Sequence, residues 1–458
     1  MNARQNSHRG SDLRSLGLKL MVVCGLALAM TIPALFVSEL VTDRMQRASE
    51  VTKEISAHVG GAQIFMGPVF AVPYRASTGA PAGSLSDGIC LIFPEQARAE
   101  VKVATTERKR SLFRVPVFAA ELKLESDFDS SALAPPAGTE FDWTRAEIIV
   151  GASDLHGALA DPTLELDGHI YGLAPSELSD RLLSQNREKA PFKGGLLAAR
   201  PDVKMATDGK MPSAFHVVSS MKFSGAERIG VVAYGKTTHV LAQGDWRNPG
   251  FDGGVLPVTR SVNDKGFRAE WMIPFTARGL RASGAGDVLS GLQATAVGFY
   301  FVQLGDPYQS VYRSLKYVLL IVGLVFLCYF GFEVTTARRV HPAQYVLVGL
   351  AQIIFYLLLL SMSERIGFDL GFLLAAGATV SLLSVNAGWI FEGSRRVLWS
   401  FGIFGILYSL IYLLLRMEDN SLLIGALSSF FAIALLMYLT RRVDWYGSPQ
   451  PAGAADQS

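Results

Sequence analysis

Apolar residues are concentrated in one early block and one late block of the chain. The uncharged apolar runs cover residues 20–37, 318–332, 345–362, 370–390, 397–415 and 422–439. A helix needs about 20 apolar residues to cross about 30 Å of hydrocarbon, and most of these runs approach that length. The pattern therefore predicts six membrane-spanning helices, and we expect Leu315, Lys316 and Tyr317 to lengthen the short second helix.

Lysine and arginine residues in the short connections predict the orientation of these helices, because cytoplasmic connections carry an excess of both. One side of the predicted bundle holds Arg4, Arg9, Arg14, Lys19, Arg338, Arg339, Arg395, Arg396, Arg441 and Arg442. The other side has only Arg365 and Arg416 in its short loops. Both termini are therefore expected in the cytoplasm, and the long segment after the first helix is expected outside it.

This topology divides the chain into five parts. They are a cytoplasmic tail (1–19), a first membrane helix (20–38), an extracytoplasmic β-rich domain (39–315), a bundle of five membrane helices (316–440) and a second cytoplasmic tail (441–458). We interpret the first helix as an uncleaved anchor. Its apolar run exceeds the roughly 7–15 residues of a signal peptide, and no small-x-small cleavage site follows it.

Apolar and polar residues alternate with a period of two throughout residues 39–315, which is typical of half-buried strands. The expected strands cover residues 89–93, 115–118, 121–125, 146–150, 163–170, 215–223, 237–242 and 267–273. Only residues 42–58 and 175–189 have a helical pattern there, and Ser176 stands at the N-cap position of the second. The predicted fold class is a membrane α-helical protein of six helices with a large β-rich, sandwich-like extracytoplasmic domain inserted between the first two.

Composition agrees with this class and excludes others. Of 458 residues, 50% are hydrophobic and 18% charged, and the mean hydropathy is +0.29. A net charge of +2, from 42 basic and 40 acidic residues, argues against a strongly basic nucleic-acid binder. Cys24 and Cys328 lie in predicted membrane helices, which leaves Cys90 alone in the domain, so we expect it to be buried and unpaired.

Residues 230–237 match the phosphate-binding pattern G-x-x-x-x-G-K-[ST]. Such a loop binds phosphate when a helix follows it, because the helix N-terminus and the loop amides face the anion. Residues 238–242 alternate as a strand does, so we interpret the segment as a hairpin turn and expect no bound nucleotide.

The sequence contains no H-E-x-x-H, C-x-x-C or G-x-S-x-G motif, and its histidines show no i, i+4 pair suited to a metal. We therefore assign no catalytic residue, no metal ligand and no cofactor.

Polar residues in or beside membrane helices are the tentative functional positions, because their burial in lipid is costly. They are Glu333, His341, Gln344, Gln352, Glu364 and Arg365. Glu333 is expected at the membrane interface, and Glu364 and Arg365 can neutralise each other. Gln352, like Asn386, is expected to form an interhelical hydrogen bond. His341 and Gln344 flank Pro342 and are expected to cap helix ends or to meet lipid headgroups.

Several motifs, in one order along the chain, resemble the CreD family of bacterial inner-membrane proteins. They are Gly61-x-Gln63-x-x-x-Gly67-Pro68, Gly244-Asp245-Trp246, Pro249-Gly250-Phe251-x-Gly253, Gly266-Phe267-x-Ala269-x-Trp271, His341-Pro342-Ala343-Gln344-Tyr345 and Val443-Asp444-Trp445-Tyr446. The resemblance covers about residues 18–446. It departs at His58, where an aromatic residue is usual, and at His156, where arginine is frequent. It implies an association with cell-envelope integrity and envelope stress, and it implies no catalytic residue or cofactor.

Together these features predict a non-enzymatic protein of the bacterial inner membrane that supports envelope integrity or the envelope-stress response through its periplasmic domain. The expected partners are membrane lipids and periplasmic envelope proteins or polymers, without nucleic acid or nucleotide. An alternative is a membrane enzyme that acts on envelope lipid or glycan at the outer membrane face through residues such as Glu364, Arg365 and Asp369. A transporter is less favoured, because the pattern shows neither a broken helix nor a midplane charge.

Overall fold

The computed structural model describes residues 7–76, 88–110, 113–129, 135, 139–185, 192, 195–201, 214–281, 283–285, 288–302, 307–336 and 338–416, with single residues 426, 427, 430, 434 and 437. The chain forms two compact units. The helical unit consists of Met1–Ala48 and Gly305–Ser458, and the β-rich unit consists of Ser49–Leu304.

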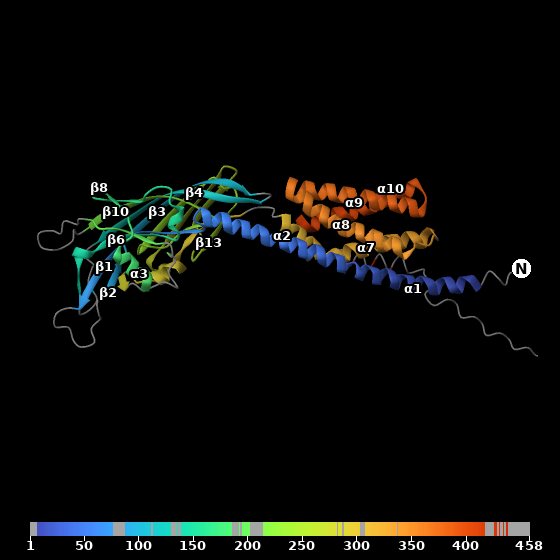
Figure 1. The fold of residues 1–458 in the computed structure, drawn as a ribbon, viewed down its shortest axis with the longest axis horizontal. Coiled ribbons are helices and arrows are strands. Elements are labelled where there is room, and N and C mark those ends of the chain that lie inside the picture. The colour runs from blue at the N-terminus through green and yellow to red at the C-terminus, as the bar shows by residue number, and fades with distance from the viewer. Residues whose placement is uncertain are drawn as a thin grey trace, which may run out of the picture. The chain divides into compact units, whose positions relative to one another are not determined.

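The helical unit contains helices that match the predicted apolar runs. Its elements are α1 (Ser7–Ala29), the first part of α2 (Thr31–His58), α6 (Pro307–Leu315), α7 (Val318–Thr336), α8 (Pro342–Ile366), α9 (Phe368–Phe391) and α10 (Ser394–Arg416). Helices α8, α9 and α10 run side by side, and α1 packs against α7 and α8 (Figure 1). Within the described residues, four helical stretches are long and apolar enough to cross a membrane, or five if α6 and α7 count as one bent span.

One detail of the predicted helices was wrong, and another lies outside the described residues. Lys316 and Tyr317 do not extend α7 but form a turn after α6, and the two helices meet at 56°. α6 has one polar face, whereas α7 is apolar along most of its length, so the two helices suit different surroundings. This bent pair is a broken helix that the sequence pattern did not reveal. The predicted sixth run, 422–439, falls outside the described residues except for the single helical positions given above.

The β-rich unit contains two sheets in its described residues. The nine-stranded sheet consists of β1 (Gln63–Ala76), β2 (Gly88–Ile92), β5 (Thr139–Phe141), β6 (Glu147–Ala152), β9 (Leu196–Ala199), β11 (Arg228–Val231), β13 (Pro249–Gly253), β16 (Ser283–Ala285) and β17 (Val297–Phe301). The eight-stranded sheet has the order β14 (Thr259–Asn263), β15 (Gly266–Ile273), β12 (Thr237–Gly244), β3 (Gln96–Arg110), β4 (Phe113–Asp129), β10 (Ala214–Ala226), β7 (Thr163–Leu166) and β8 (His169–Gly172). Most neighbouring strands are antiparallel, but β1 with β11 and β3 with β12 are parallel.

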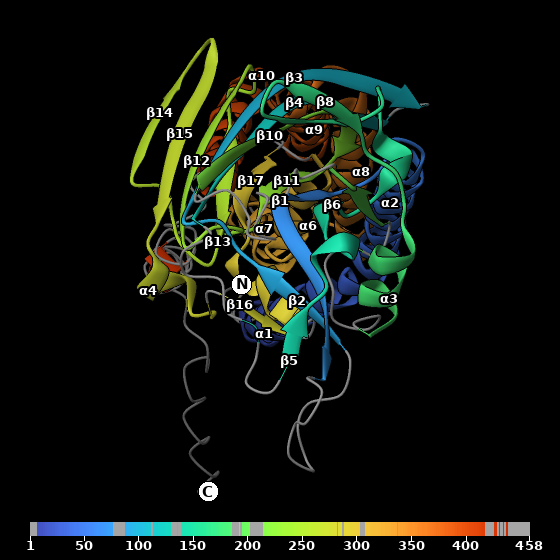
Figure 2. The same ribbon diagram turned by 90° about the vertical axis from the view of Figure 1, so that its left-hand side faces the viewer.

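The two sheets share one apolar core. Phe70 on β1 contacts Phe128 on β4 and Phe215 on β10, with ring centroids 5.1 Å apart in both pairs. On β3 and β4, buried residues alternate with exposed ones, so one face of the eight-stranded sheet packs on the core and the other faces solvent (Figure 2). The candidate binding groove lies on this exposed face.

Most predicted strands are present, and some of their limits differ. Residues 115–118 and 121–125 belong to the single strand β4, which pairs along its length with β3 and β10. Residues 163–170 are not one strand, because Asp167 and Gly168 adopt positive φ angles and turn the chain from β7 into β8. Cys90 is buried in β2, as expected.

The helical predictions for this segment hold in part. α2 includes residues 42–58, and α3 (Glu177–Gln185) begins after Ser176, whose Oγ accepts the Ser179 N–H at 3.0 Å. Residues 186–189 of the second predicted helix lie outside the described residues. The sequence pattern did not reveal the short helices α4 (Phe275–Arg278) and α5 (Val288–Gly291).

The segment that matches the phosphate-binding pattern is not a hairpin turn. It leaves β11 in one sheet and enters β12 in the other, so residues 232–236 cross between the sheets. Tyr234 is fully buried in this crossing, and its hydroxyl lies 2.7 Å from the carbonyl oxygen of Arg98 and 3.0 Å from that of Glu125. A strand does follow the lysine, as predicted, and Lys236 forms an ion pair with Glu95.

Candidate functional site

Glu333 lies in the last turn of α7 and is buried. Its carboxylate accepts the Val340 N–H at 3.0 Å and the Tyr345 hydroxyl at 3.2 Å, and it forms an ion pair with Lys19 of α1. We call these four residues the Glu333 cluster. Because a buried carboxylate needs several donors, the cluster fixes α1, α7 and the start of α8 to one another.

Aromatic side chains extend the Glu333 cluster toward α9. The ring centroids of Tyr329 and Tyr345 lie 6.4 Å apart. The Tyr329 hydroxyl lies 2.8 Å from the carbonyl oxygen of Leu383 and 3.1 Å from Oδ1 of Asn386, both on α9. The amide of Asn386 thus takes part in a contact between helices, which is the role expected of amides in such bundles.

His341 and Gln344 lie at the start of α8. His341 is the N-cap residue: its Nδ1 accepts the Ala343 N–H at 3.2 Å, and Pro342 follows it in the first turn. The Gln344 N–H donates to the carbonyl oxygen of His341 at 2.9 Å. His341 is exposed and Gln344 half-buried, so the imidazole ring remains open to its surroundings.

Gln352 is fully buried on α8, one helical turn before Tyr356. Neither atom of its amide group, nor the hydroxyl of Tyr356 or of Tyr408, has a hydrogen-bond partner among the residues that the structure describes. Gln352 therefore does not form the expected interhelical hydrogen bond within these residues.

Glu364, Arg365 and Asp369 are not brought into one site. Within residues 338–416, no ion pair joins Glu364 to Arg365, because adjacent residues on a helix point in directions about 100° apart. Asp369 instead accepts the Tyr412 hydroxyl at 3.0 Å and pairs with Arg416 at 3.3 Å. The expected mutual neutralisation of Glu364 and Arg365 was therefore wrong.

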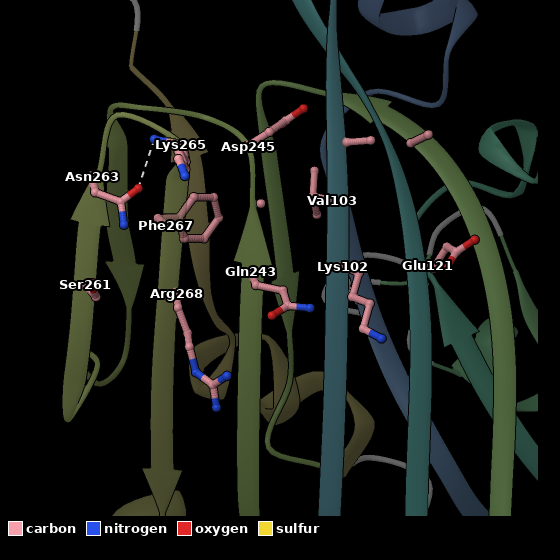
Figure 3. Close-up of a pocket in the computed structure, with 14 residues that line it drawn as sticks. Lys102, Val103, Glu121, Gln243, Asp245, Ser261, Asn263, Lys265, Phe267 and Arg268 are labelled. Carbon is pink, nitrogen blue, oxygen red and sulfur yellow. Dashed lines mark hydrogen bonds between the residues drawn. The ribbon is translucent and has the colours of Figure 1, made fainter.

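A groove of about 640 Å³ lies on the exposed face of the eight-stranded sheet, between β3, β4, β12, β14 and β15 (Figure 3). Strand pairing sets Gln243 beside Lys102 on one side and beside Arg268 on the other. Figure 3 shows these three side chains next to one another on three neighbouring strands. The sequence pattern did not reveal this groove, because β3 and β12 are far apart in the chain and their pairing register cannot be read from alternation.

The acidic groups of this groove already have partners. Glu121 pairs with Lys222 at 2.7 Å, and this hydrogen bond lowers the pKa of the Glu121 carboxyl. Asp245 accepts the Thr105 N–H at 2.9 Å and the Thr105 hydroxyl at 2.7 Å.

The basic groups of the groove are less engaged. Lys102 and Lys265 form no ion pair with any residue in the described part of the chain, and Arg268 pairs at 3.0 Å with the partly exposed Glu270. The lining of the groove therefore carries one more positive than negative charge, from Lys102, Lys265 and Arg268 against Glu121 and Asp245.

No group of three or more His, Cys, Asp or Glu side chains suited to a metal ion occurs among the described residues. The residues that sequence reasoning proposed as functional all lie in the helical unit, whereas the groove lies in the β-rich unit.

Residues 15–446 match a family model that describes the inner membrane protein CreD. The chain is also similar to the inner membrane protein CreD of Escherichia coli (strain K12). The two are 27% identical over 446 residues, which cover 94% of each chain.

Proposed function

The chain belongs to the CreD family of inner membrane proteins, and from this premise we propose that it supports cell-envelope integrity or the envelope-stress response without catalysing a reaction. Its family and its apolar helices make it a multi-pass protein of the inner membrane. In this proposal the β-rich unit meets a partner of the envelope, and the helices hold it at the membrane surface.

The proposed topology has six membrane spans, with both termini in the cytoplasm and residues 39–315 as a sandwich-like domain in the periplasm. The distribution of lysine and arginine between the short connections supports this orientation. Tails 1–19 and 441–458 then lie in the cytoplasm, and residues 20–38 and 316–440 provide the membrane helices.

The observation that carries the proposal is that a large β-rich unit with its own apolar core lies between apolar helices in the chain and has an open polar groove. A domain built in this way can bind an envelope component while the helices keep it close to the membrane. Membrane lipids, periplasmic envelope proteins and envelope polymers are the partners that suit this arrangement.

A deletion strain tests the proposed role. We expect it to become more sensitive to detergent, β-lactams or osmotic shock, and the full-length gene should restore resistance. Unchanged sensitivity under all these stresses would contradict the proposal. Alanine substitutions of Glu364, Arg365 and Asp369 test the enzymatic alternative: a non-enzymatic protein should still complement the strain, whereas an enzyme that used these residues should not.

Cysteine labelling tests the proposed topology. In a Cys24→Ser background, a membrane-impermeant maleimide should label Lys265→Cys, at the exposed turn between β14 and β15, in cells with a permeabilised outer membrane. Arg395→Cys, at the start of α10, is the matched cytoplasmic position and should react only after lysis. The reverse pattern would place the β-rich unit in the cytoplasm.

A further inference from the structure

The groove on the eight-stranded sheet has a regular polar floor. Register places Ser261, Arg268, Gln243, Lys102 and Glu121 in one row across five neighbouring strands. Neighbouring strands lie about 4.8 Å apart, so the backbones that carry Arg268 and Lys102 are roughly 10 Å apart. Figure 3 shows these two side chains lying beside Gln243 and not converging on one point. The row therefore suits an extended ligand better than a single small anion.

One end of the groove carries a third cation, Lys265. Gly266 has a φ of 135°, and a Cβ atom there would overlap the carbonyl oxygen of Gly244 on β12. Lys265 is held at this end by the turn in which its N–H donates to Oδ1 of Asn263 at 2.9 Å (Figure 3). The end of the groove thus combines a lysine with an amide side chain, at a turn where the backbones of Gly244 and Gly266 approach closely.

The charges of the groove favour an anionic ligand. The lining holds three cations, Lys102, Lys265 and Arg268, against two carboxylates, Glu121 and Asp245. Glu121 also pairs with Lys222, outside the groove. Arg268 has only the partly exposed Glu270, and exposed pairs of this kind contribute little stability. An incoming carboxylate can therefore bind these cations without first breaking a strong ion pair.

We propose that this groove binds an acidic glycan chain of the envelope, an inference that rests on the proposed placement of the β-rich unit in the periplasm. Lys102, Arg268 and Lys265 bind carboxylates spaced along the chain, and Gln243, Ser261 and Asn263 hydrogen-bond to sugar hydroxyls and amides. The groove is open along the sheet, so a polymer can pass through it without a free end.

Other ligand classes fit the groove less well. A nucleic-acid strand needs aromatic side chains on which bases stack, and the one aromatic residue of the lining, Phe267, is buried. A lipid chain needs an apolar wall, whereas the side chains that face solvent in this groove are mainly charged or amide groups.

Binding by the full-length protein in detergent tests the proposal. The probe is a set of fluorescently labelled, uncrosslinked peptidoglycan strands, whose peptides carry carboxylates. The neutral control is chitohexaose, a chain of related amino sugars without carboxylates. We expect Lys102→Gln and Arg268→Gln each to raise the Kd for the strands about tenfold, as the loss of one charge-assisted contact should. Chitohexaose should bind much more weakly than the strands.

The matched control is Arg98→Gln. Arg98 lies on β3, four residues from Lys102 on the same face but outside the groove lining. The Arg98→Gln substitution should change the Kd for the strands by less than about twofold, because salt screens charges at that separation. The groove variants should melt at the wild-type temperature, since Lys102 and Arg268 are exposed.

Several outcomes would overturn the proposal. They are equal binding of chitohexaose, wild-type binding by the groove variants, an equal loss in Arg98→Gln, and displacement of the strands by millimolar inorganic phosphate. The maleimide experiment separately tests whether the β-rich unit lies in the periplasm. Glycan binding without periplasmic labelling would refute the placement alone, and labelling without glycan binding would refute the groove alone.

Discussion

Lys19 and Glu333 lie 314 positions apart in the sequence and form an ion pair between α1 and α7. The side chain of Glu333 is only 9% exposed and that of Lys19 is 23% exposed, so much of the pair is shielded from water. Removing one member of such a pair leaves the other charge without a partner, which costs more than the pair itself contributes. This contact therefore lets the N-terminal helix influence the stability of the whole helical unit.

We expect Glu333→Ala to lower the free energy of unfolding of the helical unit by about 3 kcal/mol. The substitution leaves Lys19 unpaired and also removes the acceptor of the Val340 N–H and the Tyr345 hydroxyl. Thermal melting of the full-length protein in detergent measures the effect. The double variant Lys19→Met/Glu333→Ala should lose less than the sum of the single variants, because the two charges interact directly.

The matched control for this prediction is Glu392→Ala. Glu392 also pairs with an arginine of the helical unit, Arg338, at 2.6 Å, but the pair is exposed to solvent. Its removal should barely change the melting temperature. A large loss in Glu392→Ala, or additive losses in the Lys19/Glu333 double variant, would contradict the special role given to the Glu333 cluster.

Local patterns were sufficient to predict the long apolar helices and about half of the strands that the structure describes. The apolar length of α8, α9 and α10 and the alternation in β4, β10 and β15 are properties of neighbouring residues, and the structure follows them. The turn at Lys316 and Tyr317 was missed, because apolar length alone does not distinguish a continuous helix from two helices that face different surroundings.

Features that depend on distant residues could not be predicted in this way. The crossing of residues 232–236 between the sheets requires knowledge of which strands β11 and β12 join. The groove requires the register that sets Lys102 beside Gln243, and the Glu333 cluster requires the contact of α1 with α7. The error at Glu364 and Arg365 was avoidable, because helical geometry alone separates adjacent side chains.

Gln63, at the start of β1, connects three parts of the β-rich unit. It is fully buried, and its Nε2 donates to the carbonyl oxygens of Gly60 at 2.8 Å and Asp154 at 2.9 Å, while its Oε1 accepts the Ser153 hydroxyl at 3.1 Å. Gln63→Leu should therefore lower the free energy of unfolding of this unit by about 2–3 kcal/mol, because two buried carbonyl groups lose their donor.

Chemical denaturation, followed by tryptophan fluorescence, measures that loss. Gln96→Leu on β3 makes the same change at an exposed position and should have little effect. A loss of similar size in both variants would show that the amide network around Gln63 is not the cause.

Tyr234 provides a test of the crossing between the two sheets. Its buried hydroxyl lies within hydrogen-bond distance of the carbonyl oxygens of Arg98 on β3 and Glu125 on β4, and burial raises its pKa well above the usual value. Tyr234→Phe should cost about 1–2 kcal/mol, because both carbonyl oxygens lose this donor. Tyr300→Phe, at a residue that is 41% exposed, is the matched control and should melt like the wild type. Equal melting of all three proteins would contradict the role given to the hydroxyl.

Arg278 is a residue of the β-rich unit whose charge works against folding. It is 3% exposed, its guanidinium stacks on the ring of Phe93 at 4.0 Å, and its nitrogens have no hydrogen-bond partner among the described residues. Burial lowers its pKa from the usual value of an arginine to about 10. The charged form is therefore less stable in the folded protein than in the unfolded chain, and an apolar side chain of similar length should be better tolerated.

We expect Arg278→Met to raise the free energy of unfolding at neutral pH by about 1 kcal/mol, because relief from charge burial outweighs the lost contact with Phe93.

The pH dependence gives a second measurement. Below pH 10, Arg278 is protonated in both the folded and the unfolded wild-type protein. It therefore adds nothing there to the pH dependence of the free energy of unfolding. Above pH 10, and up to the usual pKa of an arginine, the folded state binds fewer protons at Arg278 than the unfolded state, so the contribution of Arg278 makes stability rise with pH. The advantage of Arg278→Met over the wild type should therefore shrink across that window, whereas exposed Arg281→Met should show no such change. A neutral-pH loss of stability in Arg278→Met would contradict the prediction and show that the contact with Phe93 outweighs the cost of charge burial.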